Sequence, residues 1–407
     1  MALDQRLLAY DYYLGFDVGK FFHHACAIRS SDQKIVFSRR VAQDEQALRE
    51  IISEAAFKGS TLVSVDQKGA LGSLVIAIAK DLGVDVGFIP PYDFKQYSDA
   101  YAEAKTDAVD AYVIADISMR MTHRLYPVGD TDERLYALKV LTTHRSALVA
   151  ESTRDKNRLH DLLTKTHPAL ERVFDKSALD SSIYLRILEQ YGGSEGLSRA
   201  GRKRLEAFIA KQPYAGGKAE SIAEKIFSAI DKQTFTVAAV DVTESIIRSL
   251  AGNLLCRRVE ISALEEQIAA YYALFPESAI LSSIPGVGDT LGPVILAEIG
   301  NIDRFGSAAE LAAYAGVGPS KKQSGVSRGT SVKKKRCNRA LKNALCTAAQ
   351  CAARSHDLSA AYYDRKRAEG KSHKQSVLAL ARRRTDMIFA MLVTGSLYDQ
   401  AINAKKL

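Results

Sequence analysis

The sequence predicts an α/β domain at the N-terminus followed by an all-α remainder. Short apolar runs, two of them ending in Asp, alternate with helical patterns over residues 1–130. Long stretches with apolar residues at helical spacing then fill residues 131–275. Shorter helical patterns with glycine turns and basic clusters occupy residues 276–356, and a basic helical tail covers residues 357–407. Four regions are therefore expected, and only the first is expected to contain a sheet.

The N-terminal region begins with three expected strands, at residues 12–18, 24–28 and 35–41. Asp44 then caps a helical pattern, and further elements alternate between helix and strand, at residues 44–56, 61–66, 72–82 and 85–89. The helix that carries Asp107 and Asp110 comes last. Three strands followed by alternating helix and strand is the element order of the RNase H-type nuclease fold. Because one fold can host several functions, the function must be argued from the site.

Four acidic residues form the candidate site of this region. Asp17 ends the first expected strand, and Asp66 ends the strand at 61–66. Asp107 and Asp110 are three residues apart, so a helix places both on one face. Such carboxylates repel one another unless cations lie among them, and oxygen ligands suit Mg²⁺ or Mn²⁺. Taken singly, each Asp is more simply a turn residue or a helix cap, so their joint placement is what predicts a metal site for phosphodiester chemistry.

Composition restricts the classes of partner. The 407-residue chain has a net charge of +9 and a pI near 9.1, which favours a polyanion over a small acidic substrate. No pair among its five cysteines has Cys-x-x-Cys spacing, so neither a zinc site nor a disulfide framework is expected. The sequence shows no signal peptide and no apolar run of about 18 residues, so we expect a cytoplasmic protein without membrane contact.

Two long amphipathic patterns dominate the middle of the chain. They run from about Asp132 to Phe174 and from Val242 to Leu274, each with an apolar stripe and a charged outer face. A coiled coil that joins subunits is one interpretation, and a helical hairpin within one chain is the other. Residues 190–220, between the two patterns, are rich in glycine and are expected to form loops that link short helices.

A glycine turn opens the C-terminal third. Ile284-Pro285-Gly286-Val287-Gly288 is followed by an apolar helix at 291–299, which matches the helix-hairpin-helix pattern. In that motif the turn around Gly286 and Gly288 presents backbone N–H groups to a phosphate. The alternative is an ordinary glycine-rich connection between two helices.

A basic run follows this turn. Residues 311–356 contain no Asp or Glu, and such a run either binds phosphates or forms a solvated basic face. Together with Lys105 beside the acidic helix, the expected nucleic-acid contacts are Lys321, Lys322, Arg328, Lys333, Lys334, Lys335, Arg336, Arg339 and Lys342.

These motifs together resemble one known family. The resembling blocks are Gly15-Phe16-Asp17-Val18-Gly19-Lys20, Lys105-Thr106-Asp107-Ala108-Val109-Asp110-Ala111, Pro285-Gly286-Val287-Gly288, Ala313-Tyr314-Ala315-Gly316-Val317-Gly318-Pro319 and Ser324-Gly325. They are similar to blocks of the two-domain transposases of bacterial insertion sequences, the bridge-RNA-guided recombinase group, which is related to the DNA invertase that switches pilin genes. The resemblance covers residues 12–128 and about 280–353.

The resemblance implies a RuvC-like acidic domain and a C-terminal domain with a catalytic serine. Asp17, Asp66, Asp107 and Asp110 would hold two Mg²⁺ or Mn²⁺ ions, and Ser324 would attack the scissile phosphate to form a phosphoserine-linked strand. The implied partners are donor and target DNA and a structured non-coding guide RNA, with base pairing choosing the sequence. A homo-oligomer is also implied, a dimer that forms a tetramer in the synaptic complex, associated with the bacterial nucleoid.

The sequence departs from the family pattern at two positions. The second acidic position is usually Glu, whereas the strand-end candidate here is Asp66. Two adjacent serines usually precede the glycine, whereas Gln323 precedes Ser324 here. Ser327 and Ser320 are therefore the reserve candidates for the nucleophile, and a turn serine is the alternative interpretation of Ser324.

Two other functions stay open at this point. A Holliday-junction nuclease of the RuvC type would use the same acids with water as the nucleophile, and it would need neither Ser324 nor an RNA. A non-enzymatic nucleic-acid-binding protein would use only the glycine turn and the basic run, but it leaves the strand-end acids unexplained.

Overall fold

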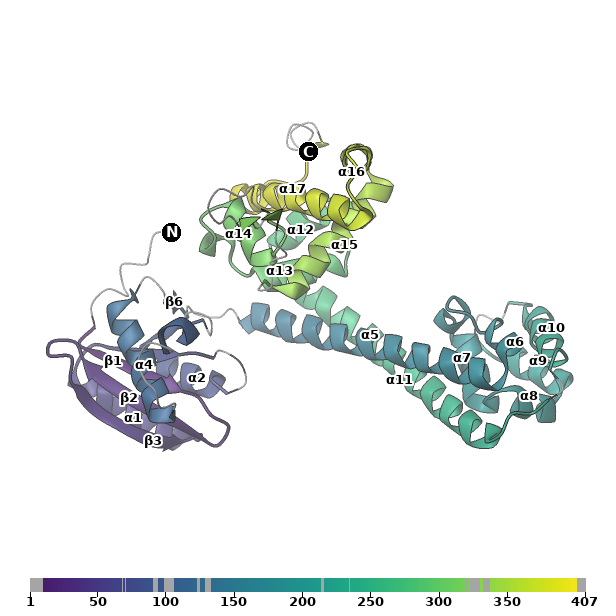
Figure 1. Cartoon of the computed structure of the whole chain (residues 1–407), viewed down its shortest axis with the longest axis horizontal. Coiled ribbons are helices and arrows are strands. Elements are labelled where there is room, and N and C mark those ends of the chain that lie inside the picture. The colour runs from purple at the N-terminus through teal and green to yellow at the C-terminus, as the bar shows by residue number, and fades with distance from the viewer. Residues whose placement is uncertain are drawn as a thin grey trace. The chain divides into compact units, whose positions relative to one another are not determined.

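The structure, a computed structural model, describes residues 10–67, 69, 71–90, 94–98, 106–122, 125–128, 133–213, 216–233, 235–318, 321–322, 330–331 and 337–400. The chain divides into two compact units, Met1–Asp132 and Glu133–Leu407. The first unit is mixed α/β and the second is almost entirely helical (Figure 1). The predicted fold class is confirmed at this level.

A six-stranded sheet forms the centre of the first unit. Its strand order is β3-β2-β1-β4-β5-β6. The strands are β1 (Tyr12–Asp17), β2 (Phe22–Arg29), β3 (Ile35–Ala42), β4 (Thr61–Val65), β5 (Asp85–Phe88) and β6 (Tyr126–Pro127). β1 is parallel to β4 and antiparallel to β2, and β4 is parallel to β5. The five expected strands are confirmed, whereas the two-residue β6 was not predicted because it is too short to produce an apolar pattern.

Helices cover both faces of this sheet. α1 (Glu45–Lys58) and α2 (Ser73–Asp81) pack on one face, and α4 (Asp107–Arg120) packs on the other. Successive residues of β1 alternate between the faces, as a pleated strand requires. Leu14 and Phe16 enter the core under α1 and α2, while Tyr13 packs with residues of α4. The Asp44 carboxylate accepts a hydrogen bond from the Ala47 N–H (2.9 Å) and so caps α1, as expected.

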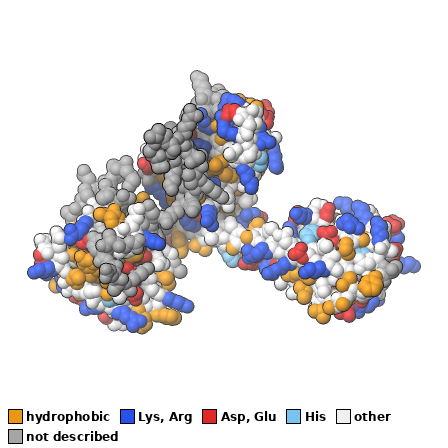
Figure 2. Space-filling model, viewed as in Figure 1, with side chains coloured by type: hydrophobic (Ala, Val, Ile, Leu, Met, Phe, Trp, Pro, Cys, Tyr) orange, Lys and Arg blue, Asp and Glu red, His pale blue; other side chains and the backbone are white. Residues whose placement is uncertain are grey.

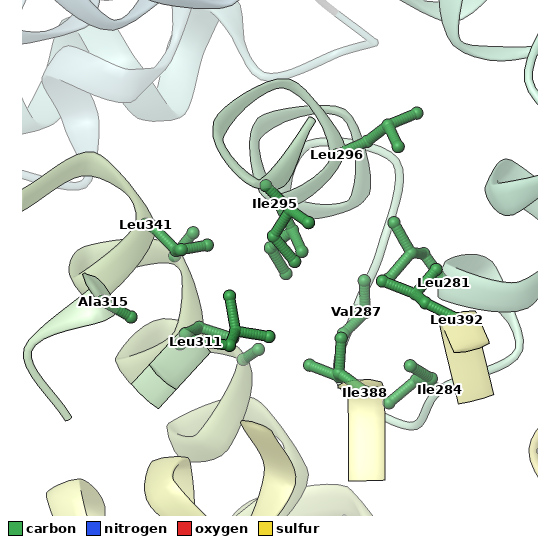
Figure 3. Packing of buried hydrophobic residues seen from close by; sticks show 14 of the residues in the cluster. Leu281, Ile284, Val287, Ile295, Leu296, Leu311, Ala315, Leu341, Ile388 and Leu392 are labelled. Atoms are coloured by element: carbon green, nitrogen blue, oxygen red, sulfur yellow. The ribbon is translucent and has the colours of Figure 1, made fainter. Parts of the chain in front are cut away.

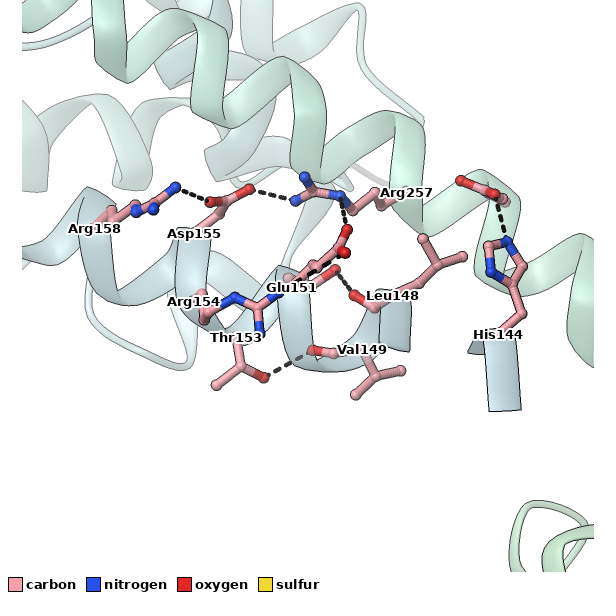
Figure 4. Close-up of polar contacts among 11 residues, drawn as sticks. His144, Leu148, Val149, Glu151, Thr153, Arg154, Asp155, Arg158 and Arg257 are labelled. Carbon is pink, nitrogen blue, oxygen red and sulfur yellow. Dashed lines mark hydrogen bonds and ion pairs between the residues drawn. The ribbon is translucent and has the colours of Figure 1, made fainter. Parts of the chain in front are cut away.

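Two long helices run side by side through the second unit, α5 (Glu133–Thr166) and α11 (Val240–Tyr272) (Figure 1). Ion pairs join them: Arg145 binds Glu265 at 2.5 Å, and Arg257 of α11 binds both Asp155 and Glu151 of α5 (Figure 4). The helices are therefore antiparallel and pair within one chain. The intramolecular hairpin is confirmed, and a coiled coil between subunits stays a prediction.

The predicted end of the first long helix was wrong. α5 ends at Thr166 rather than near Phe174, because His167 precedes Pro168. Proline disfavours the helical conformation in the residue before it and starts a new helix readily. Pro168 is accordingly the first residue of a short helix, α6 (Pro168–Glu171).

Each end of the α5–α11 pair is buried in its own core. One core joins Leu159 and Leu163 of α5 and Ile247 of α11 to several short helices. These are α6, α7 (Ser182–Tyr191), α8 (Ser194–Ala200), α9 (Arg202–Ala210) and α10 (Ala219–Ile230). The glycine-linked short helices expected for residues 190–220 are thus confirmed.

The other core holds the C-terminal helices. Leu138 of α5 and Ile268 of α11 pack there with α12 (Glu277–Ser282), α13 (Leu291–Ile299), α14 (Ala308–Ala315), α15 (Arg339–Ser355), α16 (Asp357–Ala368) and α17 (His373–Thr394). Leu281, Ile295, Leu341 and Ile388 point toward one another in its centre (Figure 3). The segment after residue 357 therefore contributes to this core. Within the described residues, no helix is both long enough and apolar enough to span a bilayer.

Candidate active site

The strand register places Asp17 and Asp66 next to each other, at the carboxyl ends of two central parallel strands. β1 and β4 are parallel neighbours, and Phe16 of β1 is level with Val65 of β4. Asp17 and Asp66 are the next residues along each strand, so both follow at the carboxyl ends of adjacent parallel strands. Asp17 is half-buried, whereas Asp66 is 9% exposed.

Helix α4 brings the other two acids toward the same sheet. The Thr106 hydroxyl accepts a hydrogen bond from the Val109 N–H (3.3 Å), which caps the helix and places Asp107 and Asp110 in its first turn. The helix lies very close to β1: a Cβ on Gly15 would stand 2.5 Å from both the Ala111 carbonyl oxygen and the Ala115 nitrogen. Glycine at position 15 therefore permits this close approach.

The charge of Asp110 affects the titration of Asp66. Burial raises the pKa of Asp66 to about 6, and the negative charge of Asp110 adds to the increase. Hydrogen bonds from its own backbone N–H and from Gln67 oppose the rise. Burial lowers the pKa of His24, while the negative charge of Asp107 acts in the opposite direction. His24 lies directly opposite Asp17 in the register between β1 and β2, so the structure brings all four acids to one region.

The chemistry of Asp66 fits a cation. Its Oδ1 atom is buried and has no hydrogen-bond partner, a state that is costly for a carboxylate. Within the described parts of the chain, however, no three His, Cys, Asp or Glu side chains stand close enough together to bind one metal ion. The four acids therefore lie in one region, but their side chains are not positioned to bind one metal ion together. Oxygen donors of this kind suit Mg²⁺ or Mn²⁺.

His24 is a residue of this region that sequence reasoning missed. Its Nε2 atom lies 2.9 Å from the Ser38 hydroxyl of the neighbouring strand. Only the pairing of β1 with β2 reveals that it stands beside Asp17. No local pattern in the sequence carries that information, because strand register is a non-local property.

In the second unit, the glycine turn lies between α12 and α13. Gly286 has a φ of +79°, and a Cβ there would stand 2.6 Å from the Ala348 carbonyl oxygen of α15. Ile284 and Val287 of the turn point into the core (Figure 3). Gly286 thus has a packing role, whereas Gly288 is exposed with open space around it. Phosphate binding by this turn stays a prediction.

A buried arginine holds the glycine turn from behind. Arg384 of α17 is 1% exposed, and its Nη2 atom donates a hydrogen bond to the Pro285 carbonyl. Burial lowers the pKa of Arg384 to about 10. Sequence reasoning missed this contact, because the arginine lies about a hundred positions downstream within a basic cluster.

Six of the expected nucleic-acid contacts and the three candidate serines lie outside the described residues. These are Lys105, Arg328, Lys333, Lys334, Lys335 and Arg336, and Ser320, Ser324 and Ser327. Lys321 and Lys322 form a short strand, β7 (Lys321–Lys322), that pairs with β8 (Thr330–Ser331). The expectation that only the N-terminal region contains a sheet was therefore wrong, because strands of two residues are too short to produce an apolar pattern.

Arg339 and Lys342 lie on the first turns of α15, Arg339 exposed and Lys342 half-buried. Asn338 caps this helix and also donates a hydrogen bond to Glu298 (2.6 Å). Lysine and arginine side chains are spread over the visible face of the helical unit (Figure 2).

The chain matches known families at both ends. Residues 14–168, which include the four acids, match a family described as a transposase. Residues 278–364, which include the glycine turn and the basic run, match the transposase IS116/IS110/IS902 family. The two matches cover nearly all of the α/β unit with the whole of α5 and, at the other end, much of the C-terminal core.

Relatives extend the similarity over nearly the whole chain. The insertion element IS110 uncharacterized 43.6 kDa protein of Streptomyces coelicolor is 38% identical over 96% of each chain. The insertion element IS900 uncharacterized 42 kDa protein of Mycobacterium paratuberculosis is 33% identical over 97% of this chain and 98% of its own. A pilin gene-inverting protein of Moraxella bovis is 29% identical over 35% of this chain and 46% of its own. The chain belongs to the IS116/IS110/IS902 family of transposases.

Proposed function

We propose that this transposase cuts and rejoins DNA strands with a divalent-metal acidic site and a serine nucleophile. Membership of a transposase family already implies DNA as the substrate. The main support for a metal site is the Oδ1 atom of Asp66, which is buried and has no hydrogen-bond partner. It lies at the carboxyl end of β4, beside the carboxyl end of β1, where Asp17 lies. A buried carboxylate oxygen without a donor is stabilised by a cation.

The four acids share one task in this proposal, which is to hold the metal. Bound Mg²⁺ or Mn²⁺ would polarise the scissile phosphate and stabilise the leaving oxygen. Asp17 and Asp66 would hold it from the sheet, and Asp107 and Asp110 from the first turn of α4. Asp66, with a pKa of about 6, would need to lose its proton before it could act as a ligand.

Ser324 is the proposed nucleophile of the second unit. Attack of its hydroxyl oxygen on phosphorus would form a phosphoserine and release a 3′ oxygen. A 3′-hydroxyl can later reverse the step, so the energy of the phosphodiester is conserved and strand exchange needs no ATP. The sequence contains no Walker-type phosphate loop, which agrees with such a mechanism.

The net charge suggests nucleic acid as the class of partner, and the resemblance to the bridge-RNA-guided group suggests the guide RNA. The net charge of +9 suits long polyanions, and a structured non-coding RNA would choose donor and target DNA by base pairing. We also propose a homo-oligomer, because strand exchange must hold two duplexes at once. The exposed apolar side chains of α5 and α11, such as Tyr136 and Val259, are compatible with contacts between subunits.

The acidic site is tested by Asp17→Asn. Loss of one ligand should reduce Mg²⁺-dependent cleavage of a branched DNA substrate by orders of magnitude, while circular dichroism shows an intact fold. Asp32→Asn is the matched control, because Asp32 is an exposed carboxylate paired with Arg29. Normal cleavage by Asp17→Asn would remove the acidic-site assignment.

The serine is tested by Ser324→Ala. This variant should bind DNA normally but form no denaturant-resistant protein–DNA adduct, because only the nucleophile is lost. Ser327→Ala is the control and should still form the adduct. If the two variants exchange these results, Ser327 is the nucleophile. If the wild-type protein cleaves DNA without any adduct, water is the nucleophile and the protein acts as a nuclease.

A further inference from the structure

An exposed cation–aromatic pair lies on the outer strands of the sheet. The Arg40 guanidinium of β3 lies 3.7 Å from the centroid of the Phe22 ring of β2. Phe22 is 46% exposed, and the preceding Phe21 is 70% exposed with the Lys20 ammonium 5.3 Å from its ring centroid. Hydrophobic burial does not explain two consecutive exposed phenylalanines that each have a cation over the ring.

The turn that presents these rings is well fixed. His23 is buried, and its Nδ1 atom accepts a hydrogen bond from the Gly19 N–H (3.2 Å). A Cβ on Gly19 would stand 2.3 Å from the Phe22 carbonyl oxygen, so only glycine allows so tight a connection. The short connection between β1 and β2 therefore places Phe21 and Phe22 just past the carboxyl end of β1, where Asp17 lies.

Arg40 of this pair lies in the same cross-strand row as Asp17, and Phe22 lies on the same face, two residues from that row. Asp17 is opposite His24, and His24 is opposite Arg40, so the three side chains lie on one face, the face that α4 covers. With strands about 4.8 Å apart, Arg40 lies roughly 10 Å from Asp17. The row therefore runs from Asp17 on β1, through His24 on β2, to Arg40 on the edge strand β3. Burial lowers the pKa of His24.

The two adjacent arginines of β3 are not equivalent. Arg39 points to the opposite face, forms an ion pair with Glu54 and lies over the Phe37 ring at 4.7 Å. Arg40 makes no ion pair with a carboxylate among the residues that the structure describes. Positive charge on an edge strand often serves only to prevent strand pairing between molecules. That explanation accounts for Arg39 and Arg40 alike, but it does not account for the exposed rings of Phe21 and Phe22.

We propose that Phe22 and Arg40, with Phe21 and Lys20, form a binding surface for unpaired nucleotides of a DNA strand. Bases would stack on the two rings, and the cations would bind the flanking phosphates. A strand held there would run along the row toward Asp17. This proposal rests on the proposed function, because the surface would bring a DNA strand to the acidic site. It adds that this strand is single-stranded where it crosses the surface.

The test measures binding of a short fluorescein-labelled oligo(dT) strand by the full chain in EDTA, so that no cleavage occurs. Phe22→Ala should weaken binding roughly 5-fold or more, the loss typical of one stacked base. Phe22→Leu keeps the apolar volume but removes the aromatic face, so it should be equally weak. Wild-type affinity in Phe22→Leu would show that the ring only packs, and would overturn the proposal.

The arginines provide a matched pair. Arg40→Gln should weaken binding and reduce the salt slope by up to about 0.7 per lost phosphate contact, whereas Arg39→Gln should leave both unchanged. Equal losses in the two variants would mean a general charge effect and would overturn the assigned surface. A loss confined to oligo(U) RNA, with oligo(dT) binding unchanged, would overturn the choice of DNA.

These results are separable from the test of the acidic site. If Asp17→Asn abolishes cleavage and Phe22→Ala binds oligo(dT) normally, the binding surface is wrong and the proposed function stands. If Asp17→Asn cleaves normally and Phe22→Ala binds weakly, the acidic site is wrong and the binding surface stands.

Discussion

Gly15 shows how one residue determines the geometry of the acidic site. Because it has no Cβ, α4 can lie against β1, and the first turn of that helix carries Asp107 and Asp110. The atoms that a Cβ would meet belong to the backbone of α4, which cannot move aside as a flexible side chain can. Gly15 therefore sets the position of two acids without touching either of them.

Gly15→Ala should destabilise the α/β unit by about 2 kcal/mol or more, because the helix must move away from the sheet. Mg²⁺-dependent cleavage should fall as well, since the first turn of α4 moves with the helix. Urea denaturation followed by circular dichroism measures the first effect. Gly69→Ala is the control, because a Cβ at position 69 meets nothing within 4 Å. Equal stability of the two variants would contradict the close contact.

At the scale of one element, His167 is the single residue between α5 and α6, and it caps the second of these helices. It is 2% exposed, and its Nδ1 atom accepts a hydrogen bond from the Leu170 N–H (3.1 Å), which caps α6 immediately before Pro168. An imidazole nitrogen that accepts a hydrogen bond must be unprotonated. Separately, burial lowers the pKa of His167 below its ordinary value of 6.5, although backbone hydrogen bonds oppose this effect.

This histidine should make the helical unit sensitive to mild acid. Because the folded pKa is lower, the unfolded chain binds the extra proton first. Its stabilising contribution is therefore complete above pH 6.5 and is lost as the pH falls toward the folded pKa, with a slope of at most about 1.4 kcal/mol per pH unit. His167→Asn keeps a capping side chain and should lose less stability between pH 7 and 5. Thermal unfolding across this range measures the difference, and the exposed His144→Asn serves as control. Parallel profiles of wild type and His167→Asn would contradict this role.

At the scale of the whole molecule, local signals predicted the elements well. Apolar runs that end in Asp located β1 and β4, and an Asp cap located α1. The end of α5 at Thr166 also has a local signal, because the His167-Pro168 pair in the sequence disfavours a helix that continues through it. The position of His24 beside Asp17, and of Arg384 behind the glycine turn, depends on contacts between distant segments. Helical and strand periodicity cannot encode such contacts.

Local sequence patterns also cannot show whether the acids and Ser324 act together in one site. Asp17 and Ser324 are separated by more than three hundred positions and belong to different compact units. Neither unit alone carries both the acids and the serine. The paired helices α5 and α11 provide a long surface on which two copies of the chain could associate, and an oligomer could then combine the acids of one copy with the serine of another.

We therefore predict a composite site, with Asp17, Asp66, Asp107 and Asp110 from one protomer and Ser324 from another. Asp17→Asn and Ser324→Ala should each be inactive alone. A mixture of the two should regain part of the strand-exchange activity, because some mixed oligomers contain one intact set of acids facing one intact serine. The double variant Asp17→Asn/Ser324→Ala mixed with either single variant is the control and should stay inactive. If the mixture of single variants is also inactive while sedimentation shows that mixed oligomers form, each site is built within one protomer, and the composite arrangement is wrong although the chemistry of the acids and the serine is unaffected.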